Sequence, residues 1–212
     1  MKAAPPSAPQ RAYWLKTLHE WHWISSAICL IGLLLFAVTG ITLNHAGQIE
    51  SKPVVVSREG LLPQPLLDVL QCVQAQQGQG APLPVPVREW LQSQMQVRVG
   101  AAAAEWSAEE SYVPMPRPGG DAWVRVDLQS GDVEYESTDR GWISYLNDLH
   151  KGRNTGAVWS LFLDLFAVGC LLFAVTGLLI LKMHAQRRPF TWPMVGLGLV
   201  VPALLALLLV GH

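Results

Sequence analysis

Three long runs of apolar residues constrain the fold of this chain more than any other feature. Residues 23–43 are 21 residues without a charge, residues 157–181 are 25 residues with one charge, Asp164, and residues 193–210 are 18 residues without any. A helix needs about 20 apolar residues to cross the ~30 Å hydrocarbon core of a bilayer. The runs therefore predict three transmembrane helices. A buried helix in a soluble core is the alternative for the third run, but the rest of the chain is too short to build that core.

The basic residues that flank these runs give the spans a direction. Lysine and arginine are enriched on the cytoplasmic side of membrane proteins, and here they cluster before the first run and between the second and third. The N-terminus is therefore predicted to be cytoplasmic, and residues 46–150 and the C-terminus are predicted to lie outside the cytoplasm. The net charge of −1 indicates no nucleic-acid partner. The basic residues concerned are Lys2, Arg11, Lys16, Lys182, Arg187 and Arg188.

The predicted fold class is an integral membrane α-helical protein with three transmembrane helices and a small extracytoplasmic α+β lobe. The first apolar run is too long for a cleavable signal and lacks a small-residue cleavage site, so it is expected to remain as an anchor. The predicted segments are a cytoplasmic N-terminal segment (1–22), transmembrane helix one (23–45), the periplasmic lobe (46–150), transmembrane helix two (151–184), a cytoplasmic loop (185–192) and transmembrane helix three (193–212).

Within the lobe, an alternating pattern predicts a β-hairpin. Apolar and polar residues alternate over 122–128 and again over 133–136, and the intervening Gln-Ser-Gly-Asp has turn chemistry. Residues 66–76 have a weak helical pattern after two prolines. Residues 111–115 are a candidate third strand, and residues 85–99 fit either class.

The six histidines are distributed unevenly along the chain. Five of them flank the first two apolar runs, whereas residues 46–149, nearly half of the chain, contain none. The lobe also lacks a nucleophile motif and a phosphate-binding glycine loop, so a chemical function is best assigned to the histidines. They are His19, His22 and His184 at the predicted cytoplasmic face, and His45 and His150 at the predicted periplasmic face.

A seven-residue sequence occurs twice in the same chain. LLFAVTG occupies residues 34–40 and 171–177, at the exit end of each of the first two spans. Because these spans run in opposite directions, the copies are related as by a two-fold axis in the membrane plane. Inverted repeats of this kind place function between the repeats. The same symmetry predicts that histidines of the two spans meet at each membrane face.

Histidines at opposite faces cannot share one metal ion. His22 and His45 are 23 residues apart, or about 35 Å along a helix. Each face therefore needs its own site, formed by His45 with His150 outside, and by His184 with His19 or His22 inside. His22 is nearer the bilayer and is the favoured inner ligand. Paired neutral imidazoles suit the axial positions of a haem iron, whereas structural zinc usually has four ligands, and a single interfacial histidine is commonly only an anchor.

Three charged residues near the second span extend this hypothesis. Lys151 and Arg153 lie on the predicted periplasmic side, against the positive-inside rule. They either bind the two propionates of a haem or are simply solvated at the interface. Asp164 lies inside the span, where a carboxylate is costly and often functional. It either bonds to a histidine, a threonine or a proton path, or reaches water at the outer interface.

Two stretches of the chain resemble the PepSY-associated transmembrane helix family: "LHEWHWISSAICLIGLLLFAVTGITLNHAG" and "TDRGWISYLNDLHKGRNTGAVWSLFLDLFAVGCLLFAVTGLLILKMHAQRRP". The segment "DLQSGDVEY" is similar to the family's small PepSY-like fragment, and the three-span form resembles its smaller branch. The resemblance implies reduction of ferric siderophores or similar acceptors. It also implies one or two b-type haems held by helix-end histidines, which match His22, His45, His150 and His184 here.

The resulting hypothesis is an inner-membrane haem protein that passes electrons from a cytoplasmic donor to a periplasmic acceptor, either a ferric chelate or a flavoprotein. Two ligand-bearing helices and one further span are compatible with a monomer, a homodimer or a complex with a second membrane subunit. Two rival functions remain open. The chain is a non-redox anchor whose lobe binds a partner protein or a peptide at its sheet edge, or a metal-uptake subunit whose histidines pass metal ions.

Overall fold

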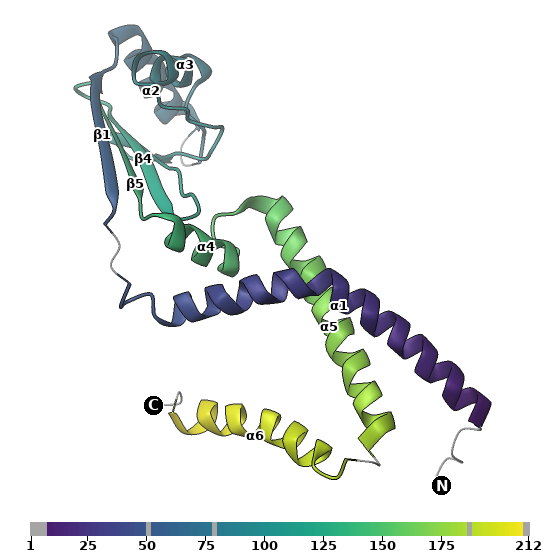
Figure 1. Ribbon diagram of the computed structural model, residues 1–212. Coiled ribbons are helices and arrows are strands. Elements are labelled where there is room, and N and C mark those ends of the chain that lie inside the picture. The colour runs from purple at the N-terminus through teal and green to yellow at the C-terminus, as the bar shows by residue number, and fades with distance from the viewer. Residues whose placement is uncertain (1–7, 50–51, 78–79, 186–187, 210–212) are drawn as a thin grey trace. The chain divides into compact units, whose positions relative to one another are not determined.

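The computed structural model describes residues 8–49, 52–77, 80–185 and 188–209 (Figure 1). The chain forms two compact units, one made of Met1–Leu35 with Leu161–His212 and the other of Phe36–Ser160. The first unit contains most of the long apolar helices, and the second contains the α+β lobe. Because the unit boundaries fall inside long helices, two of these helices contribute residues to both units.

Among the described residues, three helices are long and apolar enough to cross a membrane. They are α1 (Ala8–Asn44), α5 (Gly156–His184) and α6 (Thr191–Leu209), and they coincide with the three apolar runs. The predicted three-span fold class is thereby confirmed. α1 begins well before its apolar run because the polar segment that precedes the run contains no glycine or proline after Pro9. A proline in the first turn is tolerated because its missing N–H has no helical partner there.

In the first unit, α1 and α5 pack against each other through small residues. The ring of Phe166 on α5 lies over Gly32 of α1. The thiol of Cys29 on α1 lies over Gly169 of α5, where a Cβ would be 2.8 Å from the sulfur. Since the later residue of one helix contacts the earlier residue of the other, the helices are antiparallel. Glycines at such points allow two helix backbones to approach closely.

These two contacts are equivalent under the inverted symmetry of the repeat. Gly32 and Gly169 each stand two residues before a copy of LLFAVTG. Cys29 and Phe166 each stand five residues before one. Each helix therefore has a glycine and a larger residue at matching repeat positions. The larger residue of each helix packs on the glycine of the other. The antiparallel relation expected from the sequence is present in the packing of this unit.

The third apolar helix, α6, is the least buried of the three. None of its described side chains is buried. Pro202 stands inside the helix, where it removes one backbone hydrogen bond. Membrane helices tolerate such prolines better than soluble ones do. The position of α6 is therefore not determined by a packed interface within the described residues.

The second unit contains a five-stranded antiparallel sheet with the strand order β1-β5-β4-β3-β2 (Figure 1). The predicted hairpin is confirmed as β4 and β5, in which Val124 lies opposite Tyr135 and Val126 opposite Val133. The candidate third strand is β3. β1 is not expected from the sequence, because its valines are consecutive rather than alternating. The strands are β1 (Val54–Leu61), β2 (Glu105–Trp106), β3 (Glu110–Pro114), β4 (Gly120–Asp127) and β5 (Asp132–Asp139).

Two helices cover one face of this sheet, α2 (Gln64–Gln77) and α3 (Val85–Gln94). α2 corresponds to the weak helical pattern over residues 66–76, and α3 shows that the first part of the ambiguous segment 85–99 is helical. Sixteen buried hydrophobic residues form the core between the helices and the sheet. The principal contributors are Leu67, Leu70, Val87 and Leu91 from the helices and Val113, Val124, Val126 and Val133 from the strands.

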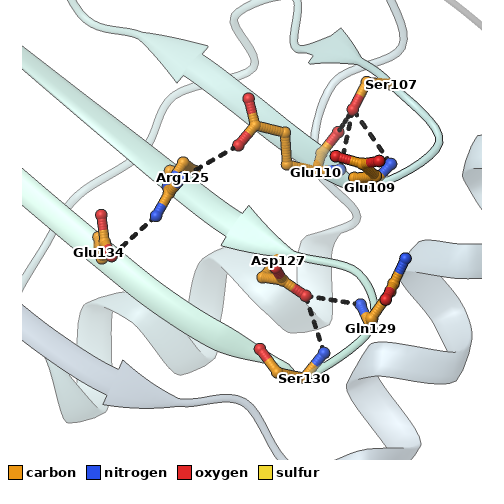
Figure 2. Close-up of polar contacts among 8 residues, drawn as sticks. All are labelled: Ser107, Glu109, Glu110, Arg125, Asp127, Gln129, Ser130 and Glu134. Atoms are coloured by element: carbon orange, nitrogen blue, oxygen red, sulfur yellow. Dashed lines mark hydrogen bonds and ion pairs between the residues drawn. The ribbon is translucent and has the colours of Figure 1, made fainter.

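The opposite face of the sheet carries polar and aromatic side chains. Arg125 of β4 lies between two carboxylates and donates to Glu110 of β3 at 3.3 Å and to Glu134 of β5 at 2.8 Å (Figure 2). These carboxylates, Glu134 first, raise the pKa of the Arg125 guanidinium. Beside them, the rings of Tyr112 and Trp123 stack with their centroids 6.0 Å apart. Cross-strand pairs of this kind fix the register of neighbouring strands.

The turn between β4 and β5 is held by one carboxylate. Asp127 accepts the backbone N–H groups of Gln129 and Ser130, each at 2.8 Å (Figure 2). These hydrogen bonds lower the pKa of the Asp127 carboxyl, because they favour its charged form. The Gln-Ser-Gly-Asp turn expected from the sequence is therefore an Asx-type turn.

The last element of the lobe, α4 (Trp142–Lys151), is not predicted by the sequence patterns. Two buried polar residues position it. The Asp148 carboxylate accepts the backbone N–H of Gly119 at 2.8 Å, and the Asn147 side-chain oxygen accepts the hydroxyl of Thr42 at 2.7 Å. Gly119 has a φ of 74°, and a Cβ there would lie 2.8 Å from the backbone of α4. A glycine is therefore required at this close approach.

Candidate functional site

In the first unit, the rings of two predicted ligands are neighbours. The ring centroids of His19 on α1 and His184 on α5 are 6.1 Å apart, with an angle of 88° between the ring planes. Both side chains are exposed. The Nδ1 atom of His19 lies 2.7 Å from the carbonyl oxygen of Leu15, and that of His184 lies 2.9 Å from the carbonyl oxygen of Ile180. Because a carbonyl oxygen can only accept, each Nδ1 carries the proton and each Nε2 keeps its lone pair.

His22 follows His19 by three residues on α1 and is half-buried against α5. Its ring stacks on that of Phe173, with centroids 4.7 Å apart and planes at 14°. Its Nδ1 lies 3.2 Å from the carbonyl oxygen of Phe173 and 3.1 Å from the hydroxyl oxygen of Thr176. The Thr176 hydroxyl donates its own proton to the carbonyl of Leu172 at 2.7 Å. Nδ1 is therefore the donor in both contacts, and Nε2 makes no hydrogen bond with the residues that the structure describes.

His150, in the last turn of α4, has a matching environment in the second unit. Its Nδ1 lies 2.6 Å from the hydroxyl oxygen of Thr39. Its ring centroid is 4.8 Å from that of Phe36. The Thr39 hydroxyl donates to the carbonyl of Phe36 at 3.2 Å. His150 is thus held by a phenylalanine and a threonine of α1, as His22 is held by a phenylalanine and a threonine of α5.

Both environments are built from the same positions of the LLFAVTG repeat. The phenylalanine packs on the imidazole, the threonine bonds to Nδ1, and the glycine leaves room for the ring. A Cβ on Gly177 would lie 3.1 Å from Cε1 of His22, and a Cβ on Gly40 would lie 3.8 Å from Cε1 of His150. We call each set a histidine socket. The His22 socket is Phe173, Thr176 and Gly177, and the His150 socket is Phe36, Thr39 and Gly40.

The sockets are a structural feature that the sequence pattern does not reveal. The repeat itself was the available signal, but its Thr-Gly pair is also typical of simple helix packing. The partner of the first copy could not be found, because it comes from α4 rather than from the second span. Each copy of the seven residues therefore contacts one imidazole.

The structure brings one predicted histidine pair together and separates the others. His19 adjoins His184, whereas His22, the favoured inner ligand, occupies its socket. His45 is exposed, and its Nδ1 lies 3.0 Å from a carbonyl oxygen of α1. Its ring makes no contact with the ring of His150 among the described residues of the second unit. His45 nevertheless resembles the other histidines, because its Nδ1 is bonded and its Nε2 is not.

The three charged candidates lie on the surface of their helices. Lys151 ends α4 and Arg153 follows it, and both are exposed. A cation at this position is favoured by the partial negative charge at a helix C-terminus. Asp164 is exposed on α5, and its carboxylate has no hydrogen bond or ion pair with the described residues. The placement of these residues leaves each available to a group outside the described chain.

The described residues contain no group of three or more histidine, cysteine, aspartate or glutamate side chains that could hold a metal ion. The histidines occur singly or as one pair. A four-ligand zinc site would need a larger cluster, whereas a haem takes only two axial ligands from the protein.

The fold and the site define a multi-pass membrane protein with histidines at the ends of its first two spans and a small antiparallel α+β lobe. The model of the PepSY_TM-like family matches residues 13–211, which is nearly the whole chain. The chain belongs to this family, as its resemblance indicated. No curated protein and no solved structure matches the chain.

Proposed function

We propose that this chain is a b-type haem protein that carries electrons across a membrane. One observation carries the proposal: in all five histidines that the structure describes, Nδ1 is bonded to an oxygen atom and Nε2 is left for coordination. Metal-binding histidines are arranged in this way, because a bond at Nδ1 fixes the ring and raises the basicity of Nε2. Histidines that act only as interfacial anchors have no need of this common arrangement.

The spacing of His19 and His184 fits one iron between their imidazoles. With metal–nitrogen bonds of about 2.0–2.1 Å, two imidazoles on opposite sides of one ion have ring centroids about 6 Å apart. The observed separation is 6.1 Å. The exposure of both rings leaves space around them for a macrocycle. These two residues would therefore be axial ligands, and the haem would supply one-electron chemistry when bound.

The remaining histidines are assigned to the same function. His22 and His150 present Nε2 from their sockets, and His45 presents it at the end of α1. They are the ligands available for further coordination, either within one chain or together with a second copy or another membrane subunit. Lys151 and Arg153, close to His150 in the sequence, are the cations available to haem propionates.

The sides of the membrane on which the donor and the acceptor would act follow from the basic residues around the spans. They favour a cytoplasmic N-terminus and a periplasmic lobe in a bacterial inner membrane. Electrons would enter from a cytoplasmic donor and leave to a periplasmic acceptor, a ferric chelate or a flavoprotein. The polypeptide contributes the ligands, their orientation and the exclusion of water by the apolar helices.

A non-redox docking function is favoured by one feature of the lobe. β1 is an edge strand, and its valines at 54, 55 and 56 are 64%, 54% and 43% exposed. An edge of this kind can pair with an extended segment of a partner protein. This function does not account for the common arrangement of the histidines, so the haem function is preferred.

The test is the haem content of the full-length protein purified from haem-replete bacteria. We expect b-type bands in the dithionite-reduced spectrum and one or two haems per chain. His19→Ala and His184→Ala should each lose the haem held by that pair. Glu20→Ala is the matched control, because it removes an exposed side chain beside His19 and should keep the wild-type haem content. A wild-type protein without haem bands, or unchanged haem content in both histidine variants, would contradict the proposal.

A further inference from the structure

The hydroxyl groups of the two socket threonines each contact both a backbone carbonyl and a histidine ring. A threonine in a membrane helix can bond to a carbonyl of the preceding turn. Thr176 does so with Leu172 at 2.7 Å, and Thr39 does so with Phe36 at 3.2 Å. Each hydroxyl oxygen then still has a lone pair, and in both sockets this lone pair faces the Nδ1 atom of a histidine. Valine would fill the same volume without this contact.

We propose that Thr176 and Thr39 are positioning residues, which accept the Nδ1 proton of His22 and His150 and so hold each ring in the tautomer that leaves Nε2 unprotonated. The bond on one ring nitrogen decides which tautomer a neutral imidazole adopts. Phe173 stacks on the His22 ring and limits its tilt, whereas Phe36 contacts the His150 ring at an angle of 51°. This choice of tautomer rests on the socket geometry, whereas the use of Nε2 as an iron ligand rests on the proposed function.

The two sockets differ in strength, and the difference makes the proposal testable. His22 has two acceptors at Nδ1, the Thr176 hydroxyl and the Phe173 carbonyl oxygen. For His150, the Thr39 hydroxyl is the acceptor found among the described residues. Removal of the hydroxyl from Thr39 should therefore release the tautomer of His150. Removal of the hydroxyl from Thr176 should leave His22 with the carbonyl and change its tautomer much less.

The chain supplies a matched control on the same helix. Thr42 stands three residues after Thr39, is half-buried where Thr39 is buried, and donates its hydroxyl to Asn147 of α4 at 2.7 Å rather than contacting a histidine. Thr42→Val therefore removes a hydroxyl that joins the same two elements. Thr39→Ser is the conservative variant, because it keeps the hydroxyl and removes only a methyl group.

The experiment is nitrogen NMR of the full-length, haem-free protein labelled with 15N-histidine, in detergent at about pH 8.5, above the ordinary pKa of histidine. His22→Gln and His150→Gln assign the two signals. We expect protonated Nδ1 in both wild-type residues. Thr39→Val should shift His150 toward the Nε2-protonated tautomer, while Thr39→Ser and Thr42→Val keep the wild-type tautomer. An Nε2-protonated His150 in the wild type, or an unchanged His150 signal in Thr39→Val, would overturn the proposal.

A second arm separates this proposal from the haem function. Loss of a hydrogen bond to a metal-binding histidine typically weakens the metal site about tenfold to a hundredfold, so Thr39→Val should weaken haem binding by about that factor and Thr42→Val should not. If the tautomers respond as expected but neither the wild type nor any variant binds haem, the haem function is contradicted and the positioning role of the threonines is supported. If the wild type binds haem but the His150 tautomer is unchanged in Thr39→Val, the positioning role of the threonines is contradicted and the haem function is supported.

Discussion

The lobe and the membrane helices of this chain are held together in different ways. The lobe buries sixteen hydrophobic side chains in one core, and several of them have no exposed surface. The most apolar windows of α1, α5 and α6 are only 17%, 6% and 0% buried. Burial of apolar surface stabilises the lobe, but it cannot drive helices together in lipid, where the acyl chains are as apolar as leucine. α1 and α5 are therefore held together by a few glycine contacts and by the His22 socket.

The two regions should therefore respond differently to substitution. The residues of the lobe core are interchangeable with other apolar residues of similar volume. The contacts between α1 and α5 are few and specific, and the residues of the His22 socket both join these two helices and orient the histidine. Substitutions should therefore affect the lobe mainly through its stability and the helices mainly through their site.

The largest effect is expected for the lobe core. Leu70 has no exposed surface, so Leu70→Ala should lower the free energy of unfolding of the lobe by about 2–5 kcal/mol. Urea denaturation of the full chain in detergent, followed by tryptophan fluorescence, measures this change. Leu204→Ala in α6 is the control, because its side chain is 49% exposed and the change should stay within about 0.5 kcal/mol. If the two substitutions lowered the free energy of unfolding equally, the proposed difference between the lobe core and the membrane helices would be contradicted.

A smaller effect is expected where α1 meets α5. A Cβ at Gly169 would lie 2.8 Å from the sulfur of Cys29, so Gly169→Val should destabilise the helix pair by about 1–3 kcal/mol through overpacking. Thermal unfolding in detergent, followed by circular dichroism, gives the comparison. Gly196→Val in α6 is the control, since nothing lies within 4 Å of a Cβ there. A Gly169 variant as stable as the Gly196 variant would mean that this contact does not hold the helices.

The two sockets should tolerate a methyl group differently. A Cβ at Gly177 would approach the His22 ring to 3.1 Å, whereas a Cβ at Gly40 would lie at an ordinary 3.8 Å from the His150 ring. Gly177→Ala should therefore shift the NMR signals of His22 at a cost below about 1 kcal/mol, and Gly40→Ala should leave those of His150 in place. The opposite order of sensitivity would contradict the socket geometry.

The smallest effect is expected at the turn between β4 and β5. The pKa of Asp127 is lowered in the folded lobe by its bonds to the backbone N–H groups of Ser130 and Gln129. A carboxyl with a lowered folded pKa stabilises the lobe above its ordinary value of about 3.9 and loses this contribution as the pH falls through the lowered pKa. Asp127→Asn should therefore melt at a slightly lower temperature than the wild type at pH 7. The two melting curves should converge in strong acid, and a difference that persists there would rule out this cause.

The sequence predicted the parts of the fold whose signals are local. The spans follow from their length, and the hairpin follows from the alternation of Val124 and Val126 with polar residues and from the turn that Asp127 caps. β1 was missed because its consecutive valines lack alternation. α4 was missed because it is positioned by polar contacts between distant residues, such as Asn147 with Thr42, which no local pattern contains.

The candidate site could be predicted only in outline for the same reason. The clustering of histidines around the spans and the inverted repeat are visible in the sequence, and they led to the His19–His184 neighbourhood as one of two choices. The socket of His150 joins residues that are 111 positions apart in the chain. Tertiary packing decides which helix supplies the imidazole that packs on a Phe-Ala-Val-Thr-Gly segment. The repeat alone therefore could not identify that helix.

The central claim is that Nε2 atoms of this chain, His19 and His184 first, are ligands to a haem iron. Electron paramagnetic resonance of the oxidised full-length protein tests it most directly. We predict a low-spin ferric signal from two imidazole ligands, because the rings of His19 and His184 are neighbours, and loss of the signal of the haem held by this pair in His184→Ala. A low-spin signal that survives unchanged in both His184→Ala and His19→Ala, or a protein without any ferric haem signal, would contradict the account.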